Sequence, residues 1–228
     1  ENLPQLKHFN YTRMLDDNTK ILINNNITSY QSEIFSLLGI SAGDLTSHTY
    51  PFLVRSNRLF ITRLPYIHSN HVTFDPIGRS WVQQRLSTSI KPFLTKTETG
   101  SPAIIAISRY YCDRRKLLNE NDFLDTLTSL SIHRIFPEKC TELEKYSYCA
   151  QAKSVLMLPS GSAYANLIFS QPGTRVVDVL PSDPSCFLSV WFLLSFDLNF
   201  DYRLILVQNS GDNLDFRQNN MIAGSSFA

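Results

Sequence analysis

Basic side chains gather directly after a short apolar run in the second half of the chain. The run covers residues 103–108, and Arg109, Arg114, Arg115 and Lys116 follow it closely. A continuous apolar run of this kind is typical of a buried strand, and ligands of parallel α/β sheets bind where such strands end. Each guanidinium offers two parallel N–H donors that match two phosphate oxygens. The pattern fits a pyrophosphate site and a solvated basic loop equally well.

A second candidate anion site follows another apolar run. We expect a strand at residues 154–158, after which the small residues Ser160, Gly161 and Ser162 precede a helical stretch. Small residues let the backbone approach an anion, and the free N–H groups of the first helical turn donate to it. An ordinary helix cap at one of the serines is the other interpretation.

The elements that must position these two segments alternate between strand and helix. We expect strands at residues 19–24, 59–62, 103–108, 132–136, 154–158 and 175–180. We expect helices at residues 30–38, 76–93, 121–130, 141–152 and 162–169. Such alternation is typical of parallel β-α-β layers. Residues 96–228 are therefore predicted to form a Rossmann-like lobe, and residues 1–95 a second, less complete one.

Two segments outside this alternation carry expectations of their own. The polar tail from Gln208 is predicted to be a loop or a loosely docked terminus. The aromatic and apolar residues 192–200 are predicted to lie in the core rather than against a ligand.

Composition excludes several classes of protein. Of the 228 residues 43% are hydrophobic, which suffices for one sizeable core or two small lobes. The 21 basic and 20 acidic side chains give a net charge of +1, so no nucleic-acid partner is predicted. Every apolar run ends well short of the ~20 residues that cross a bilayer, so we predict no transmembrane segment. The chain begins without a signal-peptide pattern, and we expect it to be a fragment.

Metal and cofactor chemistry finds little support in the sequence. His68 and His71 have the spacing of ligands on one helical face, but no third ligand is close, so we predict no metal and no cofactor. The cysteines lack C-x-x-C spacing and are predicted to be buried free thiols. They are Cys112, Cys140, Cys149 and Cys186. A serine-hydrolase elbow and a P-loop are both absent from the sequence.

Several motifs, in this order along the chain, resemble those of glycosyltransferase family 61. The matching residues are Ser108, Arg109, Arg114, Arg115, Leu117, Asn119, Glu120, Pro137, Glu138, Glu144, Ala152, Pro159, Gly161, Ala163, Asn166, Phe169, Pro172 and Gly173. The front of the chain also resembles the family, at residues 1–6 and 30–40. The similarity therefore covers nearly the whole chain and is weakest between residues 41 and 99.

This resemblance implies a fold and a reaction. The fold would be α/β and GT-B-like, with two Rossmann-like lobes of parallel sheets and an incomplete N-terminal lobe. The reaction would be an inverting transfer of a hexose or pentose from a nucleotide-sugar donor, expected to be UDP-linked, to a glycan or glycoconjugate acceptor. A bacterial member would build capsule or another surface polysaccharide in the cytoplasm or at a membrane. A eukaryotic one would work in the Golgi or endoplasmic reticulum lumen.

The resemblance also implies roles for single residues. The implied donor-binding residues are Arg109, Arg114, Arg115, Asn119, Glu120, Ser160, Gly161, Ser162, Asn166 and Asp178. Glu1 takes the acidic place of a front motif and is the implied catalytic base. We expect the arginines to face the turn at residues 160–162. We expect Asn119 and Glu120 either to cap the following helix or to orient an arginine.

Three positions depart from the family pattern. Ser160 stands where the family has His, Lys145 where it has Gln, and Asp178 where it has Glu. A serine still donates a hydrogen bond but supplies no positive charge. The alternative function is therefore a sugar-nucleotide or glycan binding module with impaired catalysis. An unrelated Rossmann-like enzyme is a third interpretation, but the G-x-G-x-x-G fingerprint expected of it is absent.

Overall fold

The structure is a computed structural model of the whole chain. It describes residues 19–24, 26–48, 53, 55, 67–68, 71–72, 76–94, 102–113, 115–159, 162–182, 189–210 and 221–223. The chain forms two compact units, Glu1–Pro92 and Phe93–Ala228. Glu1, Arg114, Ser160, Gly161, Cys186 and the strand expected at residues 59–62 lie outside the described residues.

The first unit contains short strands and two longer helices. Its elements are β1 (Ile21–Asn24), α2 (Ser29–Leu37), η2 (Ala42–Asp44), β2 (Leu45–His48), β3 (Ile67–His68), β4 (His71–Val72) and α3 (Pro76–Leu94). β1 and β2 pair in parallel, and β3 and β4 pair antiparallel. The expected strand at residues 19–24 and both expected helices are confirmed.

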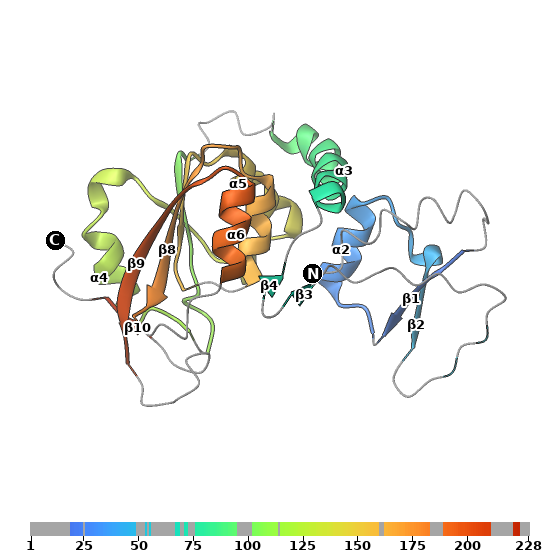
Figure 1. Cartoon of the computed structure of the whole chain (residues 1–228), viewed down its shortest axis with the longest axis horizontal. Helices are drawn as coiled ribbons and strands as arrows, with labels where there is room; N and C mark the ends of the chain where they lie inside the picture. Colours follow the sequence, from blue (N-terminus) through green and yellow to red (C-terminus); the bar gives the residue numbers. More distant parts are fainter. Residues whose placement is uncertain are drawn as a thin grey trace. The chain divides into compact units, whose positions relative to one another are not determined.

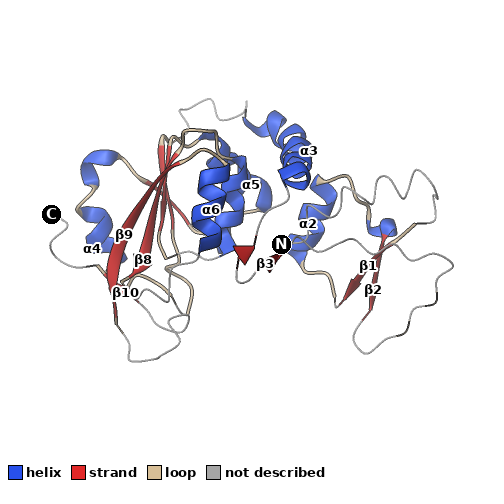
Figure 2. Cartoon of the chain, viewed as in Figure 1, coloured by secondary structure: helices blue, strands red, loops and turns tan. Residues whose placement is uncertain are grey.

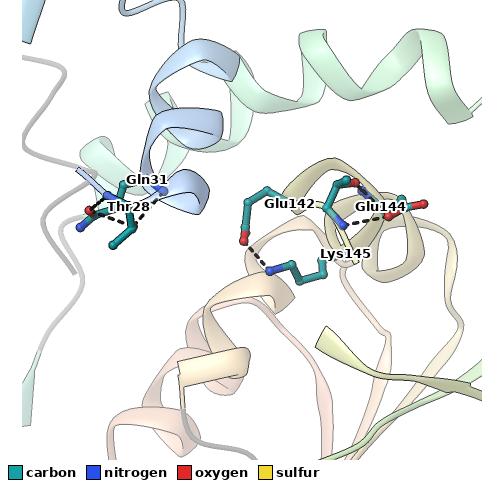
Figure 3. A network of polar contacts seen from close by, with 6 residues as sticks. Thr28, Gln31, Glu142, Glu144 and Lys145 are labelled. Atoms are coloured by element: carbon teal, nitrogen blue, oxygen red, sulfur yellow. Dashed lines mark hydrogen bonds and ion pairs between the residues drawn. The ribbon is translucent and has the colours of Figure 1, made fainter. Parts of the chain in front are cut away.

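Local chemistry explains where α2 begins and ends. Thr28 and Gln31 form a reciprocal capping box at its start (Figure 3), which satisfies N–H groups that no helical carbonyl can reach. The helix ends before Gly39, whose φ of 77° a residue with a side chain rarely adopts. The Ser89 hydroxyl of α3 donates to the Leu37 carbonyl (2.8 Å) and joins the two helices.

The second unit is a Rossmann-like α/β layer. Its main elements are β5 (Ile104–Ile107), α4 (Glu120–Asp125), β6 (His133–Ile135), α5 (Glu142–Gln151), β7 (Ser154–Met157), η5 (Ser162–Phe169), β8 (Arg175–Pro181), α6 (Ser189–Asp197), β9 (Asp201–Asn209) and β10 (Met221–Ile222). Two short 3₁₀ turns, η3 (Thr128–Leu130) and η4 (Pro137–Lys139), flank β6. The strand order is β10-β9-β8-β7-β5-β6, with only β10 antiparallel to its neighbour.

Helices cover both faces of this sheet. Figure 1 shows α4 on one side of the strands and α5 and α6 on the other, and Figure 2 shows the same layers by type of element. On the α4 side the sheet presents one continuous apolar cluster. Its buried members are Ala106, Leu117, Phe123, Leu156, Leu158, Val179, Val207, Met221 and Ala223. Burying each large aliphatic side chain contributes about 1.5–3 kcal/mol.

Two predictions for the last part of the chain differ from the structure. The polar tail predicted from Gln208 begins as strand, because β9 continues to Asn209, and residues 211–220 of this tail lie outside the described residues. After it, Met221 and Ala223 are buried, and the Met221 N–H donates to the Lys116 carbonyl (2.9 Å), so residues 221–223 are docked on the second unit. The segment predicted as core forms most of α6, where Phe192 is exposed and Phe196 is 77% exposed. Leu194 and Ser195 are the buried part of this mostly apolar helix, which packs against β9.

Candidate functional site

The two predicted anion-binding segments follow the carboxyl ends of two neighbouring strands, β5 and β7. β5 and β7 pair in parallel, with Ile107 opposite Met157. After β5 the chain runs to α4 on one face, and after β7 it runs to η5, which packs against α5 on the other face (Figure 1). Two adjacent strands whose connections diverge in this way form a topological switch point, where open α/β sheets bind their ligands.

The loop after β5 carries the arginines. The Cys112 N–H donates to the Arg109 carbonyl (2.9 Å) and closes a tight turn. Arg109 and Arg115 are half-buried, and Arg115 has a φ of 55°. This left-handed conformation costs a residue with a side chain about 1–2 kcal/mol. The structure thus places both arginines in the loop at the switch point, and their orientation toward residues 160–162 stays a prediction.

A buried polar network anchors the start of this loop. The Ser108 hydroxyl donates to Glu120 Oε1 (2.5 Å), and the Arg134 guanidinium of β6 forms an ion pair with the same oxygen. The Tyr110 N–H in turn donates to the Ser108 hydroxyl (3.1 Å). Glu120 is only 1% exposed, so its charge needs the arginine close by. The network fixes the backbone on both sides of Arg109.

Asn119 holds the other end of the loop. It occupies the N-cap position of α4, but its side chain makes no capping hydrogen bond, so the predicted cap is wrong for this residue. Instead its Nδ2 donates to the Ala223 carbonyl and its Oδ1 accepts from the Ala223 N–H, each at 2.9 Å. The side chain therefore ties the loop to the segment at residues 221–223.

The segment after β7 is tighter than expected. Ser162 begins η5, a 3₁₀-helix rather than the α-helix that the spacing indicates, and we have no physical account of this difference. Asn166 of η5 is half-buried and lines a small hollow with Ile107 and Ile135 at the ends of β5 and β6, and with Lys145 and Cys149 of α5. The hollow has room for about one water molecule.

Lys145 faces this hollow as one half of an ion pair. Its ammonium group contacts Glu142, one turn earlier on α5, and both side chains are largely buried (Figure 3). Thr141 and Glu144 form a capping box at the start of the same helix, which fixes its first turn. The position where the family has a neutral Gln thus holds a paired cation.

Asp178 is buried within the sheet and is not exposed at the carboxyl ends of the strands, where the donor site was predicted. It is level with the ends of β5 and β7, because it pairs with Met157, but it is fully buried. The Tyr202 hydroxyl donates to its Oδ2 (3.0 Å). Burial raises the pKa of Asp178 to about 6, while the Tyr202 and Tyr164 hydroxyls act in the opposite direction. Its carboxylate therefore links β8 to Tyr202 of the neighbouring strand β9.

Sequence reasoning missed Arg134 and Tyr202, which bind Glu120 and Asp178. Arg134 is a charged residue inside a short strand, which is a recognisable sign of a buried partner. Tyr202 lies in β9, a strand that the sequence did not predict, and its contact with Asp178 depends on the pairing of β9 with β8.

The described residues contain neither a candidate metal site nor a candidate membrane-spanning helix. Among them, no cluster of three or more His, Cys, Asp or Glu side chains has the arrangement of a metal site. None of their helices is long and apolar enough to cross a membrane. Cys149 is a buried free thiol, as predicted, whereas Cys112 and Cys140 are free but only half-buried.

A model of a known protein family matches most of the chain. The family model described as Glycosyltransferase 61 matches residues 2–177, which include both loops at the switch point. A comparison with curated proteins found no match.

Proposed function

The chain belongs to glycosyltransferase family 61, and we propose that it moves a sugar from a nucleoside diphosphate donor to a hydroxyl group of a glycan or glycoprotein. The observation that carries this proposal is the switch point between β5 and β7. Two sequence segments suited to anions, far apart in the chain, begin there at neighbouring strand ends. A diphosphate is the group that such an edge suits best.

We assign the donor diphosphate to the arginine loop and to the turn before η5. Arg109, Arg114 and Arg115 supply charge-assisted hydrogen bonds to its oxygens, because guanidinium forks match phosphate geometry. After the neighbouring strand β7, hydroxyl and backbone N–H donors are supplied by Ser160, Gly161 and Ser162. The proposed donor is UDP-linked.

The other implied donor residues act through their neighbours or at the rim of the site. Glu120 positions Ser108, and Asn119 positions the end of the loop, through the hydrogen bonds described above. Asp178 positions Tyr202 of β9 through the hydrogen bond that it accepts from the Tyr202 hydroxyl. Asn166 offers an amide beside the hollow at the ends of β5 and β6.

We propose a single displacement with inversion of configuration. The acceptor oxygen forms its bond to the anomeric carbon on the face opposite the diphosphate, while the bond to the diphosphate oxygen breaks. The acceptor proton passes to a base, for which we propose Glu1. The negative charge that develops on the diphosphate is stabilised by the arginines and by the N–H groups of the turn before η5.

A nucleotide-sugar screen with two matched arginine variants tests the donor site. UDP-, GDP- and CDP-sugars are titrated against the wild type by thermal shift, since a bound donor stabilises the fold in proportion to ln(1 + [L]/Kd). Arg109→Ala should weaken the best donor about 10- to 100-fold, because it removes a charge-assisted hydrogen bond. Arg175→Ala is the control, because Arg175 lies at the amino end of β8, away from the carboxyl ends of the strands, and contacts Asp201.

Two outcomes would contradict the donor site. Either no nucleotide sugar stabilises the wild type, or Arg109→Ala binds the donor as tightly as the wild type and the Arg175→Ala control do. Turnover separates a transferase from a binding module. Donor binding without transfer or donor hydrolysis, over a panel of glycan acceptors, favours the impaired binding module that Ser160 suggests. NMR of the product's anomeric proton reports inversion or retention.

Glu1→Gln tests the proposed base separately. Loss of transfer with intact donor binding supports a role as base or in positioning the acceptor. Full transfer by this variant removes Glu1 from the mechanism.

A further inference from the structure

Two exposed tyrosines form the tip of the arginine loop. Tyr110 and Tyr111 occupy the central positions of the turn closed by Arg109 and Cys112, and they are 46% and 51% exposed. Turn centres usually carry Gly, Pro, Asn, Asp or Ser. Large aromatic side chains exposed on a loop at a strand end are a stronger sign of function than buried ones.

The rings are held in a fixed arrangement. Tyr111 packs edge-on against Phe136 with ring centroids 5.0 Å apart, and Tyr110 packs edge-on against Tyr111 at 5.2 Å. Lys139 Nζ lies 3.7 Å from the Tyr111 ring centroid, and Arg134 Cζ lies 4.9 Å from the Tyr110 centroid. About half of each tyrosine stays exposed beside these contacts, so ring surface remains for a further planar group.

The position of this pair relates it to the proposed diphosphate site. Tyr110 directly follows Arg109, and Phe136 directly follows β6, the edge strand next to β5. Tyr111 contacts Phe136, so the tyrosines lie on the β6 side of the end of β5, while β7 is the neighbour of β5 on its other side. A nucleoside diphosphate whose phosphates bind at the junction of β5 and β7 can place its base, which lies beyond the ribose, on the tyrosines.

We propose that Tyr110 and Tyr111, backed by Phe136, form the stacking site for the base of the donor nucleotide. This inference rests on the proposed function and adds the base-recognition site to it. Every nucleobase has a π-face that stacks on aromatic side chains. The Lys139 ammonium beside Tyr111 supplies hydrogen-bond donors for base carbonyl oxygens. Stacking on a fixed ring loses little conformational entropy on binding, because the ring is already held by its neighbours.

Calorimetry with ligands that have or lack a base tests the proposal. UDP, GDP, CDP, ADP and inorganic pyrophosphate are titrated into the wild type and into a Tyr110→Ala/Tyr111→Ala variant. The affinity for the best nucleoside diphosphate should fall about 10- to 100-fold, and the affinity for pyrophosphate should stay within about twofold. A Tyr110→Phe/Tyr111→Phe variant should keep the wild-type affinity, since it keeps the rings. Tyr30→Ala is the matched control, because Tyr30 of α2 is equally exposed at 51%.

The outcomes separate this inference from the function on which it rests. Equal losses for nucleotide and pyrophosphate would show that the tyrosines only shape the phosphate site, and unchanged nucleotide affinity with a raised KM for the acceptor would assign them to the acceptor. Either result overturns base stacking and leaves the transferase proposal intact. Absence of nucleotide binding by the wild type overturns both. If the alanine variant does not fold, nuclear Overhauser contacts between tyrosine ring protons and base protons of bound nucleotide in the wild type decide, and their absence refutes stacking.

Discussion

Asp178→Asn should make the second unit more stable at neutral pH, because ionised Asp178 is held where water cannot reach it. The residue is fully buried, with the Tyr202 hydroxyl on Oδ2. Asparagine keeps an acceptor oxygen for Tyr202 and adds an N–H₂ donor toward the Tyr164 hydroxyl. The substitution therefore removes the buried charge while retaining shape and hydrogen bonding.

The size of the effect follows from the pKa. Burial raises the pKa of Asp178 from 3.8 to about 6. Between these values the folded chain holds a proton that the unfolded chain has lost, so stability is highest at low pH and falls as the pH rises toward 6. A difference of about two units at 1.36 kcal/mol each amounts to about 3 kcal/mol. Asp178→Asn should match the wild type near pH 4 and exceed its unfolding free energy by about 3 kcal/mol at pH 7.

Urea denaturation between pH 4 and pH 8 measures this difference. Trp191 stacks on Tyr164 with ring centroids 4.9 Å apart, so its fluorescence reports on the second unit. The chain has two tryptophans, and a Trp81→Phe background leaves Trp191 as the only one. Asp201→Asn is the control, because Arg175 and Arg203 lower the pKa of that exposed carboxylate and its contribution is lost only as pH falls. The reasoning is refuted if Asp178→Asn is less stable than the wild type at pH 7. It is also refuted if the unfolding free energy of the variant falls between pH 4 and pH 6 as steeply as that of the wild type.

Three further changes test the loop anchors and the buried thiol. Glu120→Gln should lower the unfolding free energy by about 2 kcal/mol in urea denaturation, because Arg134 loses a charged partner, and an unchanged value would contradict the network. Asn119→Ala should cost about 2 kcal/mol through the loss of two hydrogen bonds to Ala223, and faster amide exchange at Ala223 would locate the loss. Burial raises the pKa of Cys149 to about 12, so mass spectrometry should find its thiol modified by Ellman's reagent only after unfolding.

Local patterns were sufficient to predict the central strands and α5, whereas the helix predicted at residues 121–130 is α4 over Glu120–Asp125 followed by the separate turn η3. β5 and β7 read as apolar runs because parallel strands are covered on both faces, and the structure confirms both. The capping box at Thr141 likewise predicts where α5 begins. These signals lie within a few residues of the element that they specify, so the sequence alone displays them.

Nonlocal contacts explain what the sequence could not predict. β10 has two residues, and it is held by pairing with β9 and by hydrogen bonds between Met221 and the backbone beside Leu117. No local pattern marks such a strand. Leu194 and Phe196 of α6 have similar polarity, and only the position of the sheet decides that the first is buried and the second exposed. The contact between Tyr202 and Asp178 likewise depends on the register in which β8 and β9 pair, which no local pattern specifies.

The ion pair under the arginine loop has a consequence for the proposed site. Buried ion pairs add little net stability compared with apolar packing of the same volume, because both charges lose their hydration. Their hydrogen bonds are directional, however, and Glu120 binds Ser108 and Arg134 at one oxygen. Ser108 in turn accepts the N–H of Tyr110, so the backbone is fixed directly before and after Arg109. A loop that must present an arginine to phosphates and two aromatic rings to a base requires such fixation, because displacement by about 1 Å weakens catalysis sharply.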